Sequence, residues 1–315
     1  MLSIDECIAA VEKAFKLYGE GRAAPPGILG IHARGGGFHI KAGLLEVGRS
    51  YFVAKTNANF PQNPPRFGLP AIQGVIALCD AESGYPLALM DSIEITILRT
   101  GAATAVAAKH LARSDSSVAT ICGCGNQGRI QLRALEKALP LKRIYAFDRD
   151  AELSAQFADE MSAALRIEAQ VARDLKHAVG QSDVCVTCTP AKEYFLKKEY
   201  VRPGTFIAAV GADNAEKQEL DPQLFVANKI VVDILEQCAT IGDLHHALEK
   251  GLLAKSDVHA ELGEIVAGKK TGRASKEEIT IFDSTGMALQ DAAAAAVVFE
   301  KAVQNKTGMA IDFGN

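Results

Sequence analysis

A glycine-rich turn between two apolar segments constrains the fold of this chain more than any other feature. An apolar run at 118–121 leads into the turn Gly123-Cys124-Gly125-Asn126-Gln127-Gly128, an amphipathic stretch follows at 129–139, and a second apolar run at 144–147 ends at Asp148. This order of strand, G-x-G-x-x-G, helix, strand and acidic residue is that of a dinucleotide-binding βαβ unit. A structural turn in some other α/β domain is the alternative.

The residues of this turn have separate physical tasks. Gly123 permits the tight turn, Gly125 lets a pyrophosphate approach the backbone, and Gly128 lets the helix pack closely on the strand. The helix N-terminus, next to Asn126 and Gln127, then offers unpaired N–H groups to the phosphates.

The acidic residue after the second strand indicates which dinucleotide binds. The Asp148 carboxylate comes twenty residues after Gly128, where it can accept hydrogen bonds from a ribose diol and would repel a 2′-phosphate. NAD is therefore favoured. Arg149 would partly offset the repulsion, so NADP stays an alternative cofactor.

Composition narrows the class of protein. A chain of 315 residues is longer than one ordinary domain, which favours two. Its net charge of −4 and pI near 6.0 argue against nucleic acid or an anionic membrane as principal partner. No apolar run approaches the length of a membrane span, and the start, MLSIDECIAAVEKAF, is typical of an acidic amphipathic helix rather than a signal peptide. We therefore expect a cytoplasmic protein.

The order of apolar patterns predicts an α/β fold. Residues 3–19 have helical periodicity, 28–90 are β-rich, and an Ala-rich helix runs over 96–112. Helical patterns then alternate with strands, and the later strands are expected at 168–171, 184–187, 206–210, 230–233 and 279–282. This alternation predicts a Rossmann domain, a doubly wound parallel sheet, over 113–287.

The last predicted helix indicates to which domain the C-terminal residues belong. Residues 288–304, ALQDAAAAAVVFEKAVQ, are too apolar to stand in solvent, so we expect this helix to pack on the N-terminal part. The second domain is therefore a discontinuous α+β unit, made of 1–112 and completed by 288–315.

Several cysteines and histidines could in principle serve as metal ligands or redox groups. The seven cysteines, an odd number scattered through apolar runs, fit reduced buried thiols. Cys185 and Cys188 have C-x-x-C spacing, but residues i and i+3 of a strand point to opposite faces. Cys238, His245 and His246 invite a metal interpretation, yet adjacent histidines on a helix diverge by about 100° and cannot easily share one ion. We assign no metal.

Three cations lie within or beside apolar segments: Lys41 in FHIKAG, Lys55 in FVAKTN and Arg99 in TILRTG. Lysine and arginine are seldom buried unless they are paired or bind a ligand. We expect Lys55 to point into a cleft, and Arg99, in the first turn of its helix, to hold a substrate carboxylate. A snorkelling surface residue or a structural ion pair is an equally weighted alternative for each.

Polar residues follow three of the predicted strands. Asp213 comes after the Gly211 turn, at the edge where open α/β sheets bind ligands, and could act as a general base near a nicotinamide. A turn or helix N-cap aspartate is the alternative. Ser284 follows another strand, and Thr187 and Thr189 end a third, where they suit contact with the nicotinamide ribose.

With these motifs in place, the chain resembles the ornithine cyclodeaminase/μ-crystallin family, and within it the archaeal-type alanine dehydrogenases. The matching segments reach from about residue 54 to residue 300. They are RTGAATAVAAKHLA, GCGNQG, VGADNAEKQELD, KIVVDILEQ, DVHAELGEIVAG and EEITIFDSTGMALQDAAAA. The resemblance implies the fold described above and dependence on NAD(P).

The resemblance also implies a reaction. Family members act on the C–N bond of a small L-amino or imino acid, with hydride transfer between the substrate Cα and the nicotinamide. An amino acid dehydrogenase or ketimine reductase is the leading expectation. The alternatives are an ornithine-cyclodeaminase-type lyase that recycles its NAD, and a non-catalytic ligand-binding protein.

Site residues follow from the same resemblance. It places Lys55 and Arg99 at the substrate carboxylate and Asp213 as the acid/base at the substrate amine. It places Lys217, Thr100 and Ser284 near the cofactor. It also implies a homodimer, formed through the β-rich domain that binds the substrate.

The chain departs from the alanine dehydrogenases of the family at one position. They carry a basic residue directly after a Pro-Pro pair, whereas here Pro25-Pro26 is followed by Gly27. Lys41 shares a strand face with His39 at i, i+2. We expect Lys41 to supply the missing charge from a different backbone position, and the side chain of the substrate is left open.

Overall fold

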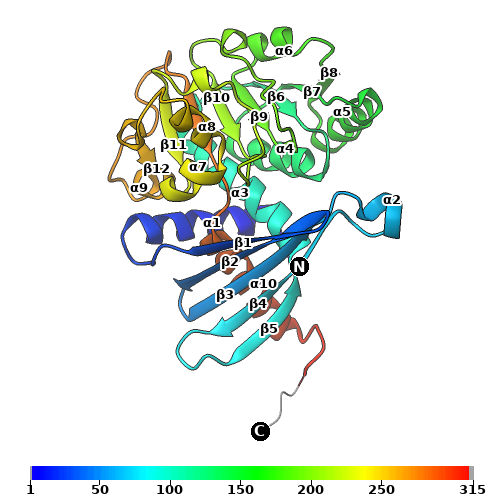
Figure 1. Ribbon diagram of the computed structural model, residues 1–315, viewed down its shortest axis with the longest axis vertical. Helices are drawn as coiled ribbons and strands as arrows, with labels where there is room; N and C mark the ends of the chain where they lie inside the picture. Colours follow the sequence, from blue (N-terminus) through cyan, green and yellow to red (C-terminus); the bar gives the residue numbers. More distant parts are fainter. Residues whose placement is uncertain (1, 312–315) are drawn as a thin grey trace.

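The computed structural model describes residues 2–311 and builds them around two β-sheets (Figure 1). The eight-stranded sheet has the order β12-β11-β13-β10-β9-β6-β7-β8, and all of its pairings are parallel. Its strands are β6 (Val118–Cys122), β7 (Arg143–Phe147), β8 (Glu168–Val171), β9 (Val184–Thr187), β10 (Phe206–Ala209), β11 (Lys229–Val232), β12 (Ala260–Glu261) and β13 (Thr280–Asp283). The antiparallel sheet consists of β1 (Gly27–Ala33), β2 (Gly36–Glu46), β3 (Ser50–Asn59), β4 (Ile72–Asp80) and β5 (Pro86–Asp91), in that order.

Helices connect the strands and cover the sheets. They are α1 (Ile4–Gly19), α2 (Asn63–Phe67), α3 (Ile93–Leu111), α4 (Asn126–Ala138), α5 (Ala151–Leu165), α6 (Leu175–Gln181), α7 (Leu235–Ile241), α8 (Asp243–Glu249), α9 (Leu262–Val266) and α10 (Ala288–Asn305). Three short 3-10 helices lie at Lys198–Tyr200, Pro222–Leu224 and Lys255–Asp257.

The central parallel strands are continuous apolar runs because both of their faces are covered. Every residue of β9, β10 and β13 is buried, as expected for a sheet between two layers of helices. With β7 and β8 on one side of β6, and β9 and β10 on the other, the strands follow the order 3-2-1-4-5 of a dinucleotide-binding sheet. The predicted α/β fold with a doubly wound parallel sheet is confirmed. Its ligand crevice is expected where β6 and β9 end side by side.

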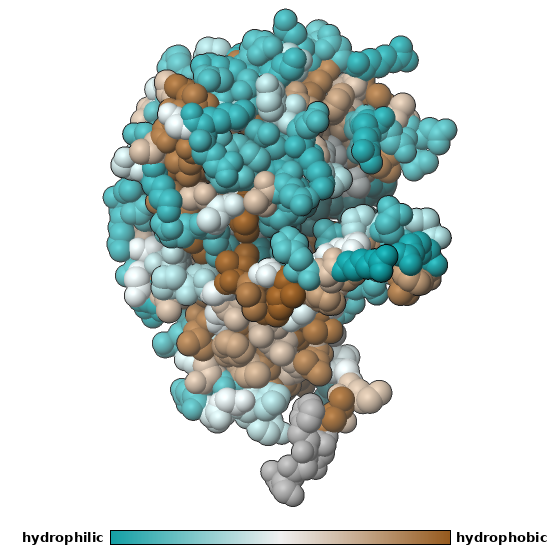
Figure 2. Space-filling view, in the orientation of Figure 1, coloured by the Kyte–Doolittle hydropathy of each residue, from teal (hydrophilic) through white to brown (hydrophobic). Residues whose placement is uncertain are grey.

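The antiparallel sheet has one buried and one exposed face, and the strand register defines them. Tyr51, Val53 and Lys55 alternate as buried residues along β3, and Lys41 on β2 pairs with Lys55 on this inner face. The outer face carries large apolar side chains that stay exposed: Leu29, Ile31, Phe38, Leu44, Val75 and Leu89. Figure 2 shows apolar side chains gathered over this half of the molecule.

Three helices, α1, α3 and α10, pack together between the two sheets. The final helix, α10, packs on β2, β3 and α1, so this helix lies against the N-terminal part of the chain (Figure 1). α3 packs on α1 and α4. It begins at Ile93, earlier than expected, because Asp91 accepts a hydrogen bond from the Ile93 N–H at 2.6 Å. Arg99 therefore lies in the second turn of α3, and its expected place in the first turn was wrong.

Three sequence-based expectations concern the chain as a whole. The division into domains at residues 113 and 288 stays a prediction. Within residues 2–311, the helices are all too short or too polar to cross a lipid bilayer. The seven cysteines are free thiols, five of them buried.

Candidate active site

The glycine turn joins β6 to α4, and each of its glycines is required for a different reason. Gly123 has a φ of +105°, a left-handed conformation that other residues rarely adopt. A Cβ on Gly128 would lie 2.0 Å from the carbonyl oxygen of Gly123, so only glycine lets α4 approach the strand. A Cβ on Gly125, the N-cap of α4, would meet no described atom within 4 Å. The space over Gly125 is therefore open to a ligand.

The N-terminus of α4 faces this open space. Its first N–H groups have no intrahelical acceptors, and among the described residues no side chain caps them. Asp148, directly after β7, stabilises the turn: its carboxylate accepts hydrogen bonds from the N–H groups of Cys124, at 2.9 Å, and Asp150, at 3.1 Å. The Asp148 side chain is only partly buried, so its oxygens keep lone pairs for a further donor. Arg149 is exposed.

Lys55 and Arg99 are buried and share one counterion, Asp291 on α10. Lys55 Nζ lies 2.8 Å and 2.7 Å from the two carboxylate oxygens of Asp291, and Arg99 Nε donates to Asp291 Oδ1 at 3.1 Å. Arg99 also donates to the side-chain oxygen of Gln290 at 3.0 Å. Asp291 and Gln290 are completely buried. α10 thus fixes the positions of both cations.

Lys41 adds a third buried cation. It lies directly opposite Lys55 in the register of β2 and β3, and like charges in that position repel each other. Its Nζ donates to the backbone carbonyls of Thr285, at 2.6 Å, and Gly286, at 2.8 Å. These acceptors are neutral. Among the described residues, Asp291 is the one carboxylate in ion-pair contact with the cluster, while Asp213 and Asp233 attract Lys41 from farther away. In direct contact, positive charge therefore exceeds negative charge. Such an excess of buried positive charge is costly unless an anion binds.

The excess of positive charge changes the acidity of the lysines. Burial lowers the pKa of Lys55 to about 7, and the neighbouring Arg99 charge acts in the same direction against the opposing effect of Asp291. Burial and Arg99 also lower the pKa of Lys41. Lys55 therefore gains and loses its proton near neutral pH, as a general acid or base must.

Asp213 lies in the turn after β10 and forms an ion pair with Lys217. Lys217 Nζ donates to Asp213 Oδ1 at 2.7 Å and to the Gly211 carbonyl at 3.1 Å. Desolvation acts to raise the pKa of Asp213, but the Lys217 ammonium outweighs it and brings this pKa to about 2. The charge of Lys41 acts in the same direction as Lys217, so the carboxylate lies near the cation cluster. Its side chain is 49% exposed and accessible to a ligand.

The sequence profile of the ornithine cyclodeaminase/mu-crystallin family matches residues 1–306. The chain belongs to this family. The alanine dehydrogenase of Archaeoglobus fulgidus is 41% identical over 99% of this chain and 95% of its own length. A solved archaeal alanine dehydrogenase dimer with bound NAD has a TM-score of 0.95 at 41% identity, covering 99% of this chain and 96% of that one. The Thermococcus litoralis Δ(1)-pyrroline-2-carboxylate reductase, solved with NADH and L-proline, has a TM-score of 0.90 at 34% identity, covering 98% and 96%.

Several of the side chains that are expected to contact the cofactor already form hydrogen bonds with other groups of the protein. Thr100 Oγ1 donates to the Thr96 carbonyl at 2.7 Å, Thr189 Oγ1 to Glu219 at 2.7 Å, and Ser284 Oγ to Asp233 at 2.9 Å. The Thr187 hydroxyl, by contrast, is buried without a hydrogen-bond partner among the described residues. The cofactor roles of these four residues stay predictions.

Sequence reasoning missed two buried acids. Asp291 was treated only as part of an apolar packing helix, although a charged residue inside the run LQDAAAAA was a signal. Glu219 joins two loops at the carboxyl edge of the sheet: it accepts hydrogen bonds from the N–H groups of Thr189, at 2.6 Å, and Gly211, at 3.0 Å. Burial and the nearby Asp243 carboxylate raise the pKa of Glu219 to about 7.

The structure also corrects the expectation that His245 and His246 point apart. Their ring centroids are 3.8 Å apart. The divergence of about 100° holds for the Cα–Cβ directions of adjacent helical residues, whereas rotation about the side-chain bonds brings these two rings together. A ligand atom of each ring can therefore lie within reach of one ion.

Proposed function

We propose that this family member is an NAD-dependent oxidoreductase that acts on the C–N bond of a small L-amino acid or imino acid. The observation that carries the proposal is the buried cluster of Lys41, Lys55 and Arg99, in which Asp291 is the one carboxylate, among the described residues, that pairs directly with the cations. A substrate carboxylate supplies the missing negative charge. The half-exposed Asp213 carboxylate supplies a partner for the substrate amine.

The glycine turn supports NAD as the cofactor. The open space over Gly125 and the uncapped N–H groups of α4 fit a pyrophosphate, and Asp148 fits a ribose diol but repels a 2′-phosphate. When bound, NAD or NADH supplies the hydride acceptor or donor for the substrate Cα. A tenfold or greater preference for NAD over NADP in binding is the expected result.

The three buried cations have different tasks in the proposed reaction. Arg99 keeps guanidinium N–H groups beyond those bound to Asp291 and Gln290, and these, with Lys41, bind the substrate carboxylate. Binding of that anion beside Lys55 raises the lysine pKa from about 7 and favours the protonated form. When the product carboxylate leaves, the Lys55 pKa falls back toward 7 and the lysine releases this proton to solvent.

Asp213 acts at the substrate nitrogen. Its pKa of about 2 keeps it ionised at neutral pH, so it accepts hydrogen bonds from the substrate ammonium and stabilises positive charge on the C=N group. Lys217 occupies only Oδ1 of Asp213, at 2.7 Å, so the second carboxylate oxygen can accept from the substrate nitrogen. The family resemblance also implies that Lys217 lies near the cofactor.

The decisive experiment is a screen of L-amino acids with NAD, and of cyclic and linear imino acids with NADH, followed by NADH absorbance and ammonia release. Net NADH formation or consumption supports the dehydrogenase or reductase proposal. Ammonia release without a net change in NADH identifies a cyclodeaminase instead. Cofactor binding without turnover on any of these compounds refutes catalysis and leaves a ligand-binding protein.

Asp213→Asn tests the role of the carboxylate once a substrate is known. We expect turnover to fall by a factor on the order of 10²–10⁴, with NAD affinity unchanged. Glu216→Gln, the same chemical change at an exposed site on the same turn, is the matched control and should retain activity. Activity of Asp213→Asn within about tenfold of the parent would show that turnover does not require the Asp213 carboxylate.

We further propose that the chain is a cytoplasmic homodimer. The outer face of the antiparallel sheet, with exposed Leu29, Leu44 and Val75, is more apolar than the surface of a monomer usually is, and the solved archaeal alanine dehydrogenase is a dimer. Val75→Asp should convert the dimer to a monomer in sedimentation velocity. Val171→Asp, the same change at an exposed position of β8, should leave the dimer intact.

A further inference from the structure

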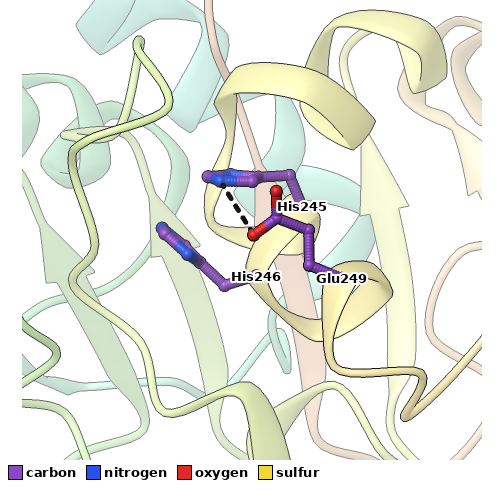
Figure 3. Close-up of side chains that lie close together, drawn as sticks. All are labelled: His245, His246 and Glu249. Atoms are coloured by element: carbon purple, nitrogen blue, oxygen red, sulfur yellow. Dashed lines mark ion pairs between the residues drawn. The ribbon is translucent and has the colours of Figure 1, made fainter.

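A cluster of metal-binding side chains lies on α8, away from the cation cluster. His245, His246 and Glu249 each offer one ligand atom, and these atoms all lie within 4.8 Å of one another (Figure 3). Glu249 reaches back along the helix toward both rings, and its carboxylate is 4.0 Å from His245 Nε2. The two imidazoles and the carboxylate therefore converge on one small volume.

The hydrogen bonds of the two histidines leave one nitrogen free on each ring. His245 Nδ1 is 2.6 Å from the Gly242 carbonyl, and His246 Nε2 is 2.8 Å from the Lys217 carbonyl. A carbonyl can only accept, so each of these nitrogens carries the proton and the other nitrogen keeps a lone pair. A ring N–H held by a backbone carbonyl, with the second nitrogen free, is the arrangement that metal-ligating histidines adopt.

We propose that His245, His246 and Glu249 bind one divalent transition-metal ion of the zinc class. Imidazole nitrogens and a carboxylate oxygen are ligands that zinc accepts, and three protein ligands leave a fourth position for water. Zinc bonds of about 2.0–2.2 Å require the ligand atoms to move closer than they are now. Glu249 can make this movement without repacking, because 73% of its side chain is exposed.

The site has a direct connection to the turn that carries Asp213. The Lys217 carbonyl accepts from His246, and the Lys217 ammonium binds Asp213. An ion on His246 makes its ring N–H a stronger donor, and so strengthens the hydrogen bond to Lys217. Metal binding should therefore immobilise the segment from Asp213 to Lys217. The effect on this segment rests on the proposed function, because Asp213 and Lys217 belong to the proposed active site. Metal binding itself does not depend on the proposed function.

The binding test uses the full chain without an affinity tag, titrated with Co²⁺ under visible absorption and with Zn²⁺ in a calorimeter. We expect the intense d–d bands of a Co²⁺ site of low coordination number, and one ion per chain. Glu249→Gln and His246→Asn should each weaken binding at least tenfold. Glu236→Gln, a similarly exposed carboxylate on α7, and His177→Asn, a histidine on α6, are the matched controls and should bind as the parent does.

Two outcomes would overturn the proposal. The first is a parent chain that gives no d–d bands and no heat with Zn²⁺. The second is binding that Glu249→Gln and His246→Asn leave unchanged while both variants retain the parent circular dichroism spectrum. The connection to the active-site turn is tested separately: Zn²⁺ should slow hydrogen exchange in 213–217 in the parent and not in Glu249→Gln, and equal exchange in both would refute it.

Discussion

Asp291→Asn tests whether one carboxylate holds the cation cluster together. Asp291 lies 2.7–3.1 Å from Lys55 Nζ and Arg99 Nε, at a site without solvent exposure. Charges about 4 Å apart attract by about 4 kcal/mol at an effective dielectric constant of 20. The asparagine keeps the shape but not the charge, so Arg99 remains buried without a counterion, and Lys55 must lose its proton or share that fate. Breaking a buried pair in this way typically costs about 3–5 kcal/mol.

Urea unfolding followed by circular dichroism measures this loss, because the chain has no tryptophan for a fluorescence assay. We expect the free energy of unfolding to fall by about 3–5 kcal/mol, a large part of the 5–15 kcal/mol typical of a folded protein. Asp115→Asn removes an exposed carboxylate that pairs with Arg113. This control should change stability little, since exposed ion pairs contribute little.

The pH dependence of stability provides a second measurement on the same variant. The Lys55 pKa is lowered from 10.5 to about 7, so between these values the unfolded chain binds the proton and the folded chain does not. The free energy of unfolding therefore rises with pH across this window. Loss of Asp291 lowers the Lys55 pKa further and extends the window below pH 7. A variant as stable as Asp115→Asn, with an unchanged pH profile, would refute the idea that Asp291 holds these cations.

Three further predictions concern other parts of the site. Gly125→Ala should keep the stability of the parent, because its Cβ enters the open space proposed for the pyrophosphate, and should lose at least tenfold in NAD affinity by calorimetry. Gly128→Ala should lose about 1–3 kcal/mol of stability, because its Cβ would lie 2.0 Å from the Gly123 carbonyl oxygen. Equal effects of the two substitutions on stability would contradict this. The Glu219 pKa is raised from 4.5 to about 7, so between these values the folded chain keeps a proton that the unfolded chain has lost. The free energy of unfolding should therefore fall as pH rises through this window, and it should fall less steeply in Glu219→Gln, where only other buried acids such as Asp243 still contribute. Lys41→Met should raise the substrate KM at least tenfold with a smaller effect on kcat, and a change confined to kcat would argue against carboxylate binding by Lys41.

The nucleotide-binding half of the site could be predicted from the sequence because its determinants are local. The glycine turn, the strands on either side and Asp148 lie within one short segment, and continuous apolar runs identify buried parallel strands. Lys41, Lys55 and Arg99 were recognisable for a similar reason, since each is a charge inside an apolar pattern. The structure brings these three cations together, as the family resemblance implied.

The parts that sequence reasoning missed depend on contacts between distant segments or on side-chain torsions. Asp291 meets Arg99 and Lys55 across 192 and 236 residues of chain, and no local pattern in an Ala-rich helix indicates such a partner. Arg99 lies one turn later in its helix than the sequence predicts, because α3 begins at Ile93, before the Ala-rich pattern. For His245 and His246, helical geometry fixes the backbone directions but not where two rotatable rings finally lie.

The position of α10 at the end of the chain has a consequence for synthesis on the ribosome. Arg99 is translated 192 residues before its counterion, which at 5–20 residues per second is a delay of roughly 10–40 s. During this interval the inner face of the antiparallel sheet has cations but no carboxylate and no helix to cover it. Folding of the N-terminal part is therefore completed only after translation of the last helix, and a chain that stops before residue 291 should depend on chaperones to stay in solution.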